Sequence, residues 1–400
     1  MSIEYFFGIT VMMQIITEIR TEDLNYPYEK WRYEVLVINA NETNAIIMNT
    51  MYPLKQMKVC AYHLEDRYKH YNNGKYQLTE QLTNTSSMSI LLRYVRRHRH
   101  LVFIIHGFLD DGRHSGWASY LGEAIKRQQP GTMVLVIDWS DGSKTLNYRY
   151  ASASAMEVAD KLANFIRQIL SARELNVQVH IIGHGLGALI GRRIVGRVPN
   201  IHRFTSLDPF GIDFETYRFG NGKAEKTDVI HTDAFVNGFG DPRAFGTVDF
   251  YMNNRDRKTK DQPGCKKPAG INVRHLLNRV QHFRFPTVKH QFHQLHRIFH
   301  LLRRSLCSHG RAVEYFIEAV MNPSCKFAGK TLEEFGKLRV LGLDTFDTID
   351  RPQSIEIKVY ADTNSSYHFC PYAVRPRPLP PPPPAQPWIR VDTNITLRGG

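Results

Sequence analysis

The sequence is poor in several features that mark specialised classes of protein. Its 400 residues hold only five cysteines and no CxxC pair, which argues against a zinc ribbon. No run of about 18 apolar residues is present, so no segment is expected to span a bilayer. There is no internal repeat, and the chain is too long for a small disulfide scaffold. We therefore expect a globular protein with a sizeable core.

The two ends of the chain differ in composition from the middle. The leader, residues 1–30, contains the apolar stretch Tyr5–Ile16, preceded by an acidic residue where a signal peptide normally carries Lys or Arg. A cleaved signal peptide, a buried strand and an imperfect start site all stay open for it. Residues 371–400 include the proline-rich run Arg375–Pro387, expected to be a disordered or polyproline II tail. The globular domain is expected over residues 31–370.

Potential N-glycosylation sites bear on whether the protein is secreted. Four N-glycosylation sequons start at Asn41, Asn84, Asn364 and Asn394. Sequons also occur by chance, so on their own they support secretion only weakly. An extracellular location is the prediction.

The middle of the chain has the pattern of an α/β protein. Short apolar runs at 101–105, 132–137 and 177–182 are typical of parallel strands that are buried on both faces. Between the last two, residues 151–170 carry apolar side chains at helical spacing. Strand, helix and strand in this order predict right-handed crossovers, with functional residues at the carboxyl ends of the strands.

One of these strand ends has the shape of a nucleophile elbow without a nucleophile. The segment VHIIGHGLGALIG follows the G-x-S-x-G pattern, but Gly185 stands where serine is usual. Glycine has no hydroxyl, so no acyl-enzyme can form at this position. Taken alone, the segment also fits a glycine-rich turn that cradles a phosphate.

The surrounding motifs carry a family resemblance. Gly107 and Phe108 follow the first strand, Asp208 follows the elbow helix, and His309 comes later, in the order elbow, Asp, His. With these motifs the sequence resembles the pancreatic lipase family, including its phospholipase A1 and yolk-protein branches. The resemblance covers roughly residues 55–370. It rests on VFIIHGFLDDG, VLVIDWSDGS, VHIIGHGLGALIG, FTSLDPFG, DVIHTDAF, GTVDFYMN, QPGC and CSHGRAVEYF.

The resemblance implies a fold and a set of roles. The fold would be an α/β-hydrolase, with a mostly parallel central sheet and helices on both faces. Gly185 would occupy the nucleophile position, Asp208 would be the triad acid and His309 the general base. The backbone N–H groups of Phe108 and Leu186 would form the oxyanion hole.

Loss of the serine defines the expected function. The main hypothesis is a lipase-like protein that does not hydrolyse esters, needs no cofactor, and binds lipid or another hydrophobic ligand or serves in yolk-type storage. The alternative is an active carboxylic ester hydrolase, either a triacylglycerol lipase or a phospholipase A1. It would need another nucleophile, and Ser140 and Ser308 are near in motif but not on the elbow.

The resemblance also implies a lid, residues 266–306, closed by a disulfide between Cys265 and Cys307. The lid holds nine Lys or Arg and six His but no Asp or Glu. Its second half is expected to be a basic amphipathic helix that makes reversible contact with an anionic membrane or packs over the pocket. The apolar face of that helix would consist of Val288, Phe292, Leu295, Phe299 and Leu302.

The lid accounts for most of the unusual charge of the chain. Lys and Arg number 52 and Asp and Glu 38, a net charge of +14, which by itself suggests nucleic acid, an anionic membrane or an acidic glycan. A second basic cluster precedes the first core strand. Outside these two segments the chain is nearly neutral, so binding to an anionic membrane or a glycan through the lid is a second alternative, and nucleic acid is not expected. The second cluster consists of Arg93, Arg96, Arg97 and Arg99.

The remaining histidines and cysteines give weaker signals. Three lid histidines lie on one helical face but lack a carboxylate or thiolate beside them, so no metal site is predicted. Cys325 and Cys370 are candidates for a second disulfide, which would leave Cys60 free. The three histidines are His293, His296 and His300.

Overall fold

The computed structural model describes the core of the chain together with isolated segments before it. The leader 1–30, the tail beyond 371 and the first part of the lid lie outside the described residues, and for 34–39, 56–62 and 290–305 only the backbone is described. The described residues are 34–39, 56–62, 92, 95–112, 117–145, 147–172, 176–210, 222–234, 238–254, 261–265, 290–324, 326–331, 337–347, 349, 356–365 and 368–371.

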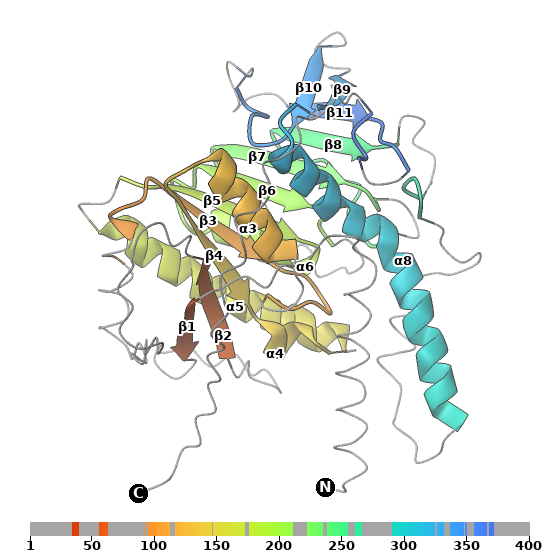
Figure 1. Cartoon of the computed structure of the whole chain (residues 1–400). Helices are drawn as coiled ribbons and strands as arrows, with labels where there is room; N and C mark the ends of the chain where they lie inside the picture. The colour runs from red at the N-terminus through yellow and green to blue at the C-terminus, as the bar shows by residue number, and fades with distance from the viewer. Residues whose placement is uncertain are drawn as a thin grey trace, which may run out of the picture.

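A single twisted sheet of eleven strands organises the described residues (Figure 1). The strand order is β1-β2-β4-β3-β5-β6-β7-β8-β11-β9-β10, and the run from β4 to β11 is parallel. Antiparallel strands flank this run at both ends. The strands are β1 Glu34–Asn39, β2 Gln56–Tyr62, β3 His100–Ile105, β4 Thr132–Asp138, β5 Gln178–His184, β6 Arg203–Leu207, β7 Lys226–His231, β8 Val248–Met252, β9 Phe327–Thr331, β10 Leu338–Leu341 and β11 Ile357–Ala361.

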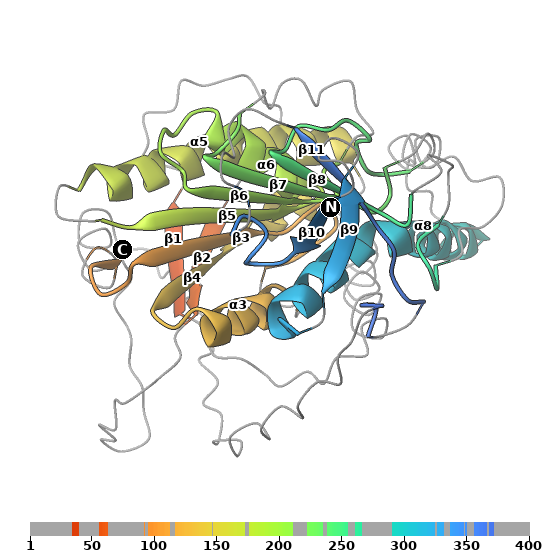
Figure 2. The same ribbon diagram turned by 90° about the horizontal axis from the view of Figure 1, so that it is seen from above.

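Helices cover both faces of this sheet, as Figure 2 shows from above. Alternate residues of β3 face opposite sides: Phe103 packs with α5 and α6, whereas Val102 packs with α3 and the C-terminal half of α8. All of these side chains are buried, which explains the continuous apolar runs in the sequence. The helices are α3 Trp117–Gln128, α4 Ser140–Ser143, α5 Tyr148–Ser171, α6 Leu186–Val195 and α8 His290–Met321.

The predicted elements of the central sheet are confirmed. The apolar runs form β3, β4 and β5, and the helical pattern over 151–170 forms α5. The fold is therefore an α/β-hydrolase fold, as expected. No helix among the described residues is both long and apolar enough to cross a membrane.

The second half of the predicted lid is helical, but it is not a separate element. It forms the first part of α8, a single helix of 32 residues that runs on through His309. In Figure 1 this first part (cyan) extends away from the sheet. Of the predicted apolar face, Val288 lies outside the described residues, as does 266–289; Phe292, Leu295, Phe299 and Leu302 lie on α8.

Candidate active site

The elbow is a strand that turns sharply into a helix. Strand β5 ends at His184, Gly185 is the residue before the helix, and α6 begins at Leu186. Gly185 has φ 56° and ψ −115°, a conformation that glycine adopts with little strain. A Cβ on Gly187 would collide with the backbone carbonyl oxygen of Ile105 on β3. The two glycines thus allow a positive φ and a close approach of backbones.

The predicted acid and base are brought together at the ends of different elements. Asp208 directly follows β6 and His309 lies on α8, and Nδ1 of His309 is 2.6 Å from Oδ2 of Asp208. The other carboxylate oxygen accepts hydrogen bonds from the backbone N–H groups of Thr232 and Asp233, at 2.8 and 2.9 Å. A carboxylate that accepts all three bonds holds the Nδ1 proton on the imidazole, which leaves Nε2 directed elsewhere.

That second imidazole nitrogen faces Gly185. A Cβ built on Gly185 would lie 2.7 Å from Nε2 of His309. Three positions predicted from the motif order, Gly185, Asp208 and His309, therefore lie in one row, in the arrangement of a nucleophile, an acid and a base. Nε2 stands so close that a side chain at position 185 would have to displace the imidazole.

Aromatic rings pack around the imidazole, and apart from Phe108 the sequence analysis did not single them out. Phe210 lies edge-on to His309 with ring centroids 5.6 Å apart, and Phe239 lies 5.7 Å from it. Phe210 also stacks on Tyr148 at 5.2 Å, and Phe108 meets Tyr148 edge-to-face at 5.4 Å. Phe210 follows Asp208 by two residues, so only its position in the motif could have drawn attention to it.

The two predicted oxyanion-hole residues follow the ends of two neighbouring strands, β3 and β5. Leu186 is the first residue of α6, where the backbone N–H has no partner within the helix. Phe108 lies just after β3, in a segment fixed by the neighbouring backbone. The N–H of Leu109 donates to the carbonyl of Ser143 at 3.0 Å, and Ser143 Oγ donates to the carbonyl of Asp110 at 2.7 Å. Leu186 thus directly follows Gly185, and Phe108 lies next to a backbone segment held by these hydrogen bonds.

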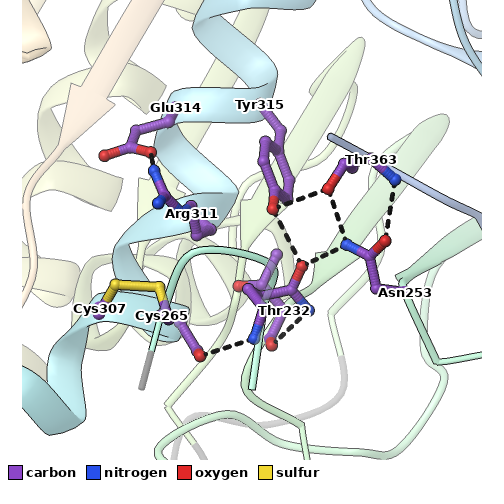
Figure 3. The surroundings of a disulfide bond; sticks show 10 residues. Thr232, Asn253, Cys265, Cys307, Arg311, Glu314, Tyr315 and Thr363 are labelled. Atoms are coloured by element: carbon purple, nitrogen blue, oxygen red, sulfur yellow. Dashed lines mark hydrogen bonds and ion pairs between the residues drawn. A yellow bond between two sulfur atoms is a disulfide. The ribbon is translucent and has the colours of Figure 1, made fainter. Parts of the chain in front are cut away.

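A disulfide, drawn in Figure 3, and the buried Gln262 attach α8 to the rest of the domain close in sequence to His309. Cys265 and Cys307 are joined as the family resemblance implied. Three residues before Cys265, the Gln262 backbone N–H donates to Ser308 Oγ at 3.0 Å. Its side-chain oxygen accepts from Tyr315 at 3.1 Å, and burial raises the pKa of that phenol to about 12. These contacts flank His309 on both sides along the helix.

The alternative nucleophiles are not placed on the elbow. Ser308 is buried and its Oγ accepts the bond from Gln262. Ser140 is the first residue of α4, after β4, and its backbone N–H donates to Asp138. Neither residue lies at the turn between β5 and α6.

The remaining predicted residues are placed as follows. Cys370 is disulfide-bonded, while its predicted partner Cys325 lies outside the described residues, as do Arg93 and the side chain of Cys60. The other three arginines of the second basic cluster are exposed, and the three lid histidines lie on α8 where only the backbone is described. The exposed arginines are Arg96, Arg97 and Arg99.

The known proteins that this chain resembles include several lipases and lipase-related proteins. Pancreatic triacylglycerol lipase of Myocastor coypus is 30% identical over 265 residues, 62% of this chain and 51% of that protein. Inactive pancreatic lipase-related protein 1 of Homo sapiens is 30% identical over 232 residues, covering 55% and 44%. Lipase member H-A of Xenopus laevis is 35% identical over 181 residues, covering 44% and 38%. The chain spans about half the length of the first of these relatives, and less of the others.

The family is shown by a match that covers most of the chain. Among solved structures, the esterase ESTFA overlaps with a TM-score of only 0.31 at 9% identity, over 55% of this chain and 71% of that one, which is too low to bear on function. The family model named Lipase, in contrast, matches residues 29–339. Gly185, Asp208 and His309 all fall inside that range, and the chain belongs to the Lipase family.

Proposed function

We propose that this protein binds lipids and does not hydrolyse esters. One observation carries the proposal: the acid–base pair Asp208–His309 is assembled and directed at Gly185, a residue with no side chain. Ester hydrolysis by this fold requires a hydroxyl at that position, which the imidazole deprotonates and which attacks the carbonyl carbon. Without it, the base has no nucleophile on the elbow to activate.

The other parts of the site, a helix N-terminus and a group of aromatic rings, are suited to binding a ligand and carry no nucleophile. N–H groups at a helix N-terminus polarise a carbonyl oxygen, and the aromatic rings around His309 favour an apolar chain. Site remnants of this kind retain only a modest rate, on the order of 10³-fold over water, in dissected enzymes. Precedent supports the proposal, because several relatives carry the name inactive pancreatic lipase-related protein 1.

The competing function is an active lipase or phospholipase A1 that uses another nucleophile. Ser308 is the nearest candidate in sequence to His309, but its Oγ already accepts a hydrogen bond from the backbone of Gln262. Ser140 belongs to α4 and not to the elbow. The arrangement of the site therefore favours lipid binding over hydrolysis.

The proposal includes an extracellular location and contact with an anionic lipid surface. Disulfides such as Cys265–Cys307 persist in oxidising compartments. The basic stretch 290–305 is a helix in a segment without acidic residues, a composition that suits binding to anionic lipids. The same charge would also allow binding to an acidic glycan, and the missing serine would also allow a yolk-like storage role.

Two measurements on the purified full chain test this function. Mass spectrometry of co-purifying molecules should find lipids, and a fluorophosphonate probe, which reacts with activated serines, should leave the protein unlabelled. The variant Gly185→Ser serves as the positive control for the probe. Stoichiometric labelling of the wild type would reveal a second nucleophile and overturn the proposal.

A further inference from the structure

Gln262 is a buried glutamine in the short segment 261–265, which lies between β8 and α8 in the chain. Its side chain is only 2% exposed with the rest of the residue. Its backbone carbonyl accepts a hydrogen bond from the N–H of Cys265 at 2.9 Å, and its backbone N–H donates to Ser308 Oγ at 3.0 Å. The backbone of Gln262 is therefore fixed both within its own turn and against α8.

The two ends of the Gln262 amide have different partners. Nε2 donates to the backbone carbonyls of Thr232 and Met252, each at 2.9 Å. Oε1 accepts from Nδ2 of Asn253 at 2.7 Å and from the Tyr315 hydroxyl at 3.1 Å. Three of these partners, Thr232, Asn253 and Tyr315, are labelled in Figure 3. Because carbonyl oxygens only accept, the partners of Nε2 fix which end of the amide is the donor.

These bonds connect the acid Asp208 to the base His309 by a second route. On the acid side, the backbone N–H of Thr232 donates to Asp208 Oδ1 at 2.8 Å, and its carbonyl accepts from Gln262. On the base side, Ser308, whose Oγ accepts from Gln262, directly precedes His309 on α8. The direct contact between Nδ1 of His309 and Oδ2 of Asp208, at 2.6 Å, completes a closed ring of contacts. All five residues of this ring are buried.

The second route is important because the acid and the base come from different kinds of element. Asp208 directly follows β6 of the central sheet, whereas His309 lies on α8, which packs on that sheet. Their bond persists only while helix and sheet keep their relative position. A shift of α8 would also break the bonds of Gln262, and each break would leave a buried polar group without a partner. Gln262 therefore resists the displacement that would separate the two side chains.

We propose that Gln262 is a positioning residue, which holds the imidazole of His309 against the carboxylate of Asp208. It acts through Thr232 on the acid side and through Ser308 on the base side. This role is independent of the lipid binding proposed above, because it concerns only contacts within the protein. The Oε1 end of the amide has a different task, since it attaches Gln262 to α8 further along the helix.

Proton NMR of the full chain tests this role through the proton that His309 and Asp208 share. A short, charge-assisted hydrogen bond gives that proton a signal far downfield. Gln262→Met keeps the length of the side chain but removes all of its hydrogen bonds, so the signal should broaden or move upfield. Tyr315→Phe is the matched control, because it removes one bond to Oε1 and leaves the route through Nε2 in place, and it should keep the signal.

The two variants are both expected to unfold at lower urea concentration, since each loses buried hydrogen bonds. Stability alone thus does not separate a positioning role from a purely structural one, but the proton signal does. A wild-type signal in folded Gln262→Met would overturn the proposal. An equal change in Tyr315→Phe would also overturn it, because the cause would then be the packing of α8 in general.

Ser308→Ala covers the case in which Gln262→Met does not fold. It removes only the hydroxyl that accepts from the Gln262 backbone and breaks the ring of contacts on the base side. The shared proton signal should move in the same direction as in Gln262→Met. A folded Ser308→Ala protein with the wild-type signal would contradict the proposal.

Labelling kinetics in the Gly185→Ser variant give a second readout. Adding Gln262→Met should lower the rate constant at saturating fluorophosphonate by on the order of tenfold to a hundredfold, because the base is displaced. The probe concentration that gives half the maximal rate should stay the same, and adding Tyr315→Phe should leave both values nearly unchanged. Partial unfolding would lower the labelled fraction and not the rate constant. Equal rate constants with and without Gln262→Met would refute the role, and the NMR signal decides if Gly185→Ser does not label.

Discussion

Replacing Gly185 by serine measures the free energy needed to displace the His309 imidazole from the space that a side chain at position 185 would take. A residue other than glycine at φ 56° and ψ −115°, a sparsely populated backbone conformation, costs about 1–3 kcal/mol. A serine hydroxyl bonded to Nε2 would hold its own Cβ about 3.5 Å from that nitrogen, whereas the Cβ position now lies 2.7 Å away. The imidazole must therefore retreat by about 1 Å against Asp208 and its aromatic neighbours, and overpacking of this kind costs about 1–3 kcal/mol.

The two contributions to that cost can be separated. Urea unfolding should show that Gly185→Ser lowers the free energy of unfolding by about 2–6 kcal/mol. Gly131→Ser, at φ 87° and with open space around its Cβ position, should lose only the backbone part, about 1–3 kcal/mol. The difference between the two variants reports the displacement of His309. If both variants lose the same amount, the imidazole does not press on Gly185 and the reasoning is refuted.

The same variant tests whether the site would support chemistry. Folded Gly185→Ser should react with a fluorophosphonate and hydrolyse a short-chain ester, because the acid, the base and the helix N-terminus are already in place. Adding Asp208→Asn to it should lower the rate by a large factor, since the imidazole would lose its orienting carboxylate. A folded Gly185→Ser protein that neither reacts with the fluorophosphonate nor hydrolyses the ester would show that positions 185, 208 and 309 are not arranged for catalysis.

Three further predictions concern stability. Burial raises the pKa of the Glu318 carboxyl, so its contribution to stability is greatest at acid pH, below the pKa of the unfolded chain, and is lost as the pH rises through the folded value. Urea unfolding from pH 4 to 7 should show that Glu318→Gln removes this part of the pH dependence; parallel curves for variant and wild type would contradict it. Reducing the Cys265–Cys307 disulfide, which links residues 42 apart, should cost about 4 kcal/mol in the same assay. A Cβ on Gly240 would lie 2.6 Å from an oxygen of the Asp208 carboxylate, so Gly240→Ala should cost about 1–3 kcal/mol and disturb the imidazole signals of the site, whereas a neutral substitution would show that the carboxylate can move freely.

The central sheet could be predicted because its signals are local. The strands β3, β4 and β5 are buried on both faces, so their sequences are continuous apolar runs, and α5 buries one face, so its apolar residues recur at helical spacing. The disulfide at Cys265 was implied only by the family motifs. It could not have come from periodicity, because its two ends are brought together by the tertiary fold.

The interior of the site could not be predicted for the same reason. Tyr148, Phe210 and Phe239 come from three separate segments, and nothing in the local pattern of each distinguishes a ring beside the imidazole from an ordinary core ring. The close approach of Nε2 to Gly185 depends on where α8 crosses the sheet. The leader, the proline-rich tail and the first part of the lid lie outside the described residues, and their predicted roles stay predictions.

The basic stretch 290–305 and the imidazole of His309 belong to one continuous helix, α8. From His290 to Met321 the helix is about 48 Å long, and its first residue is about 28 Å from His309 along the axis. No loop interrupts the helix between these points, so the orientation of the basic stretch and the position of the imidazole are set by one continuous helix. The Cys265–Cys307 bond ties this helix to residue 265 only two residues before His309. For the basic stretch to move independently of His309, at least one helical turn between them would have to unfold.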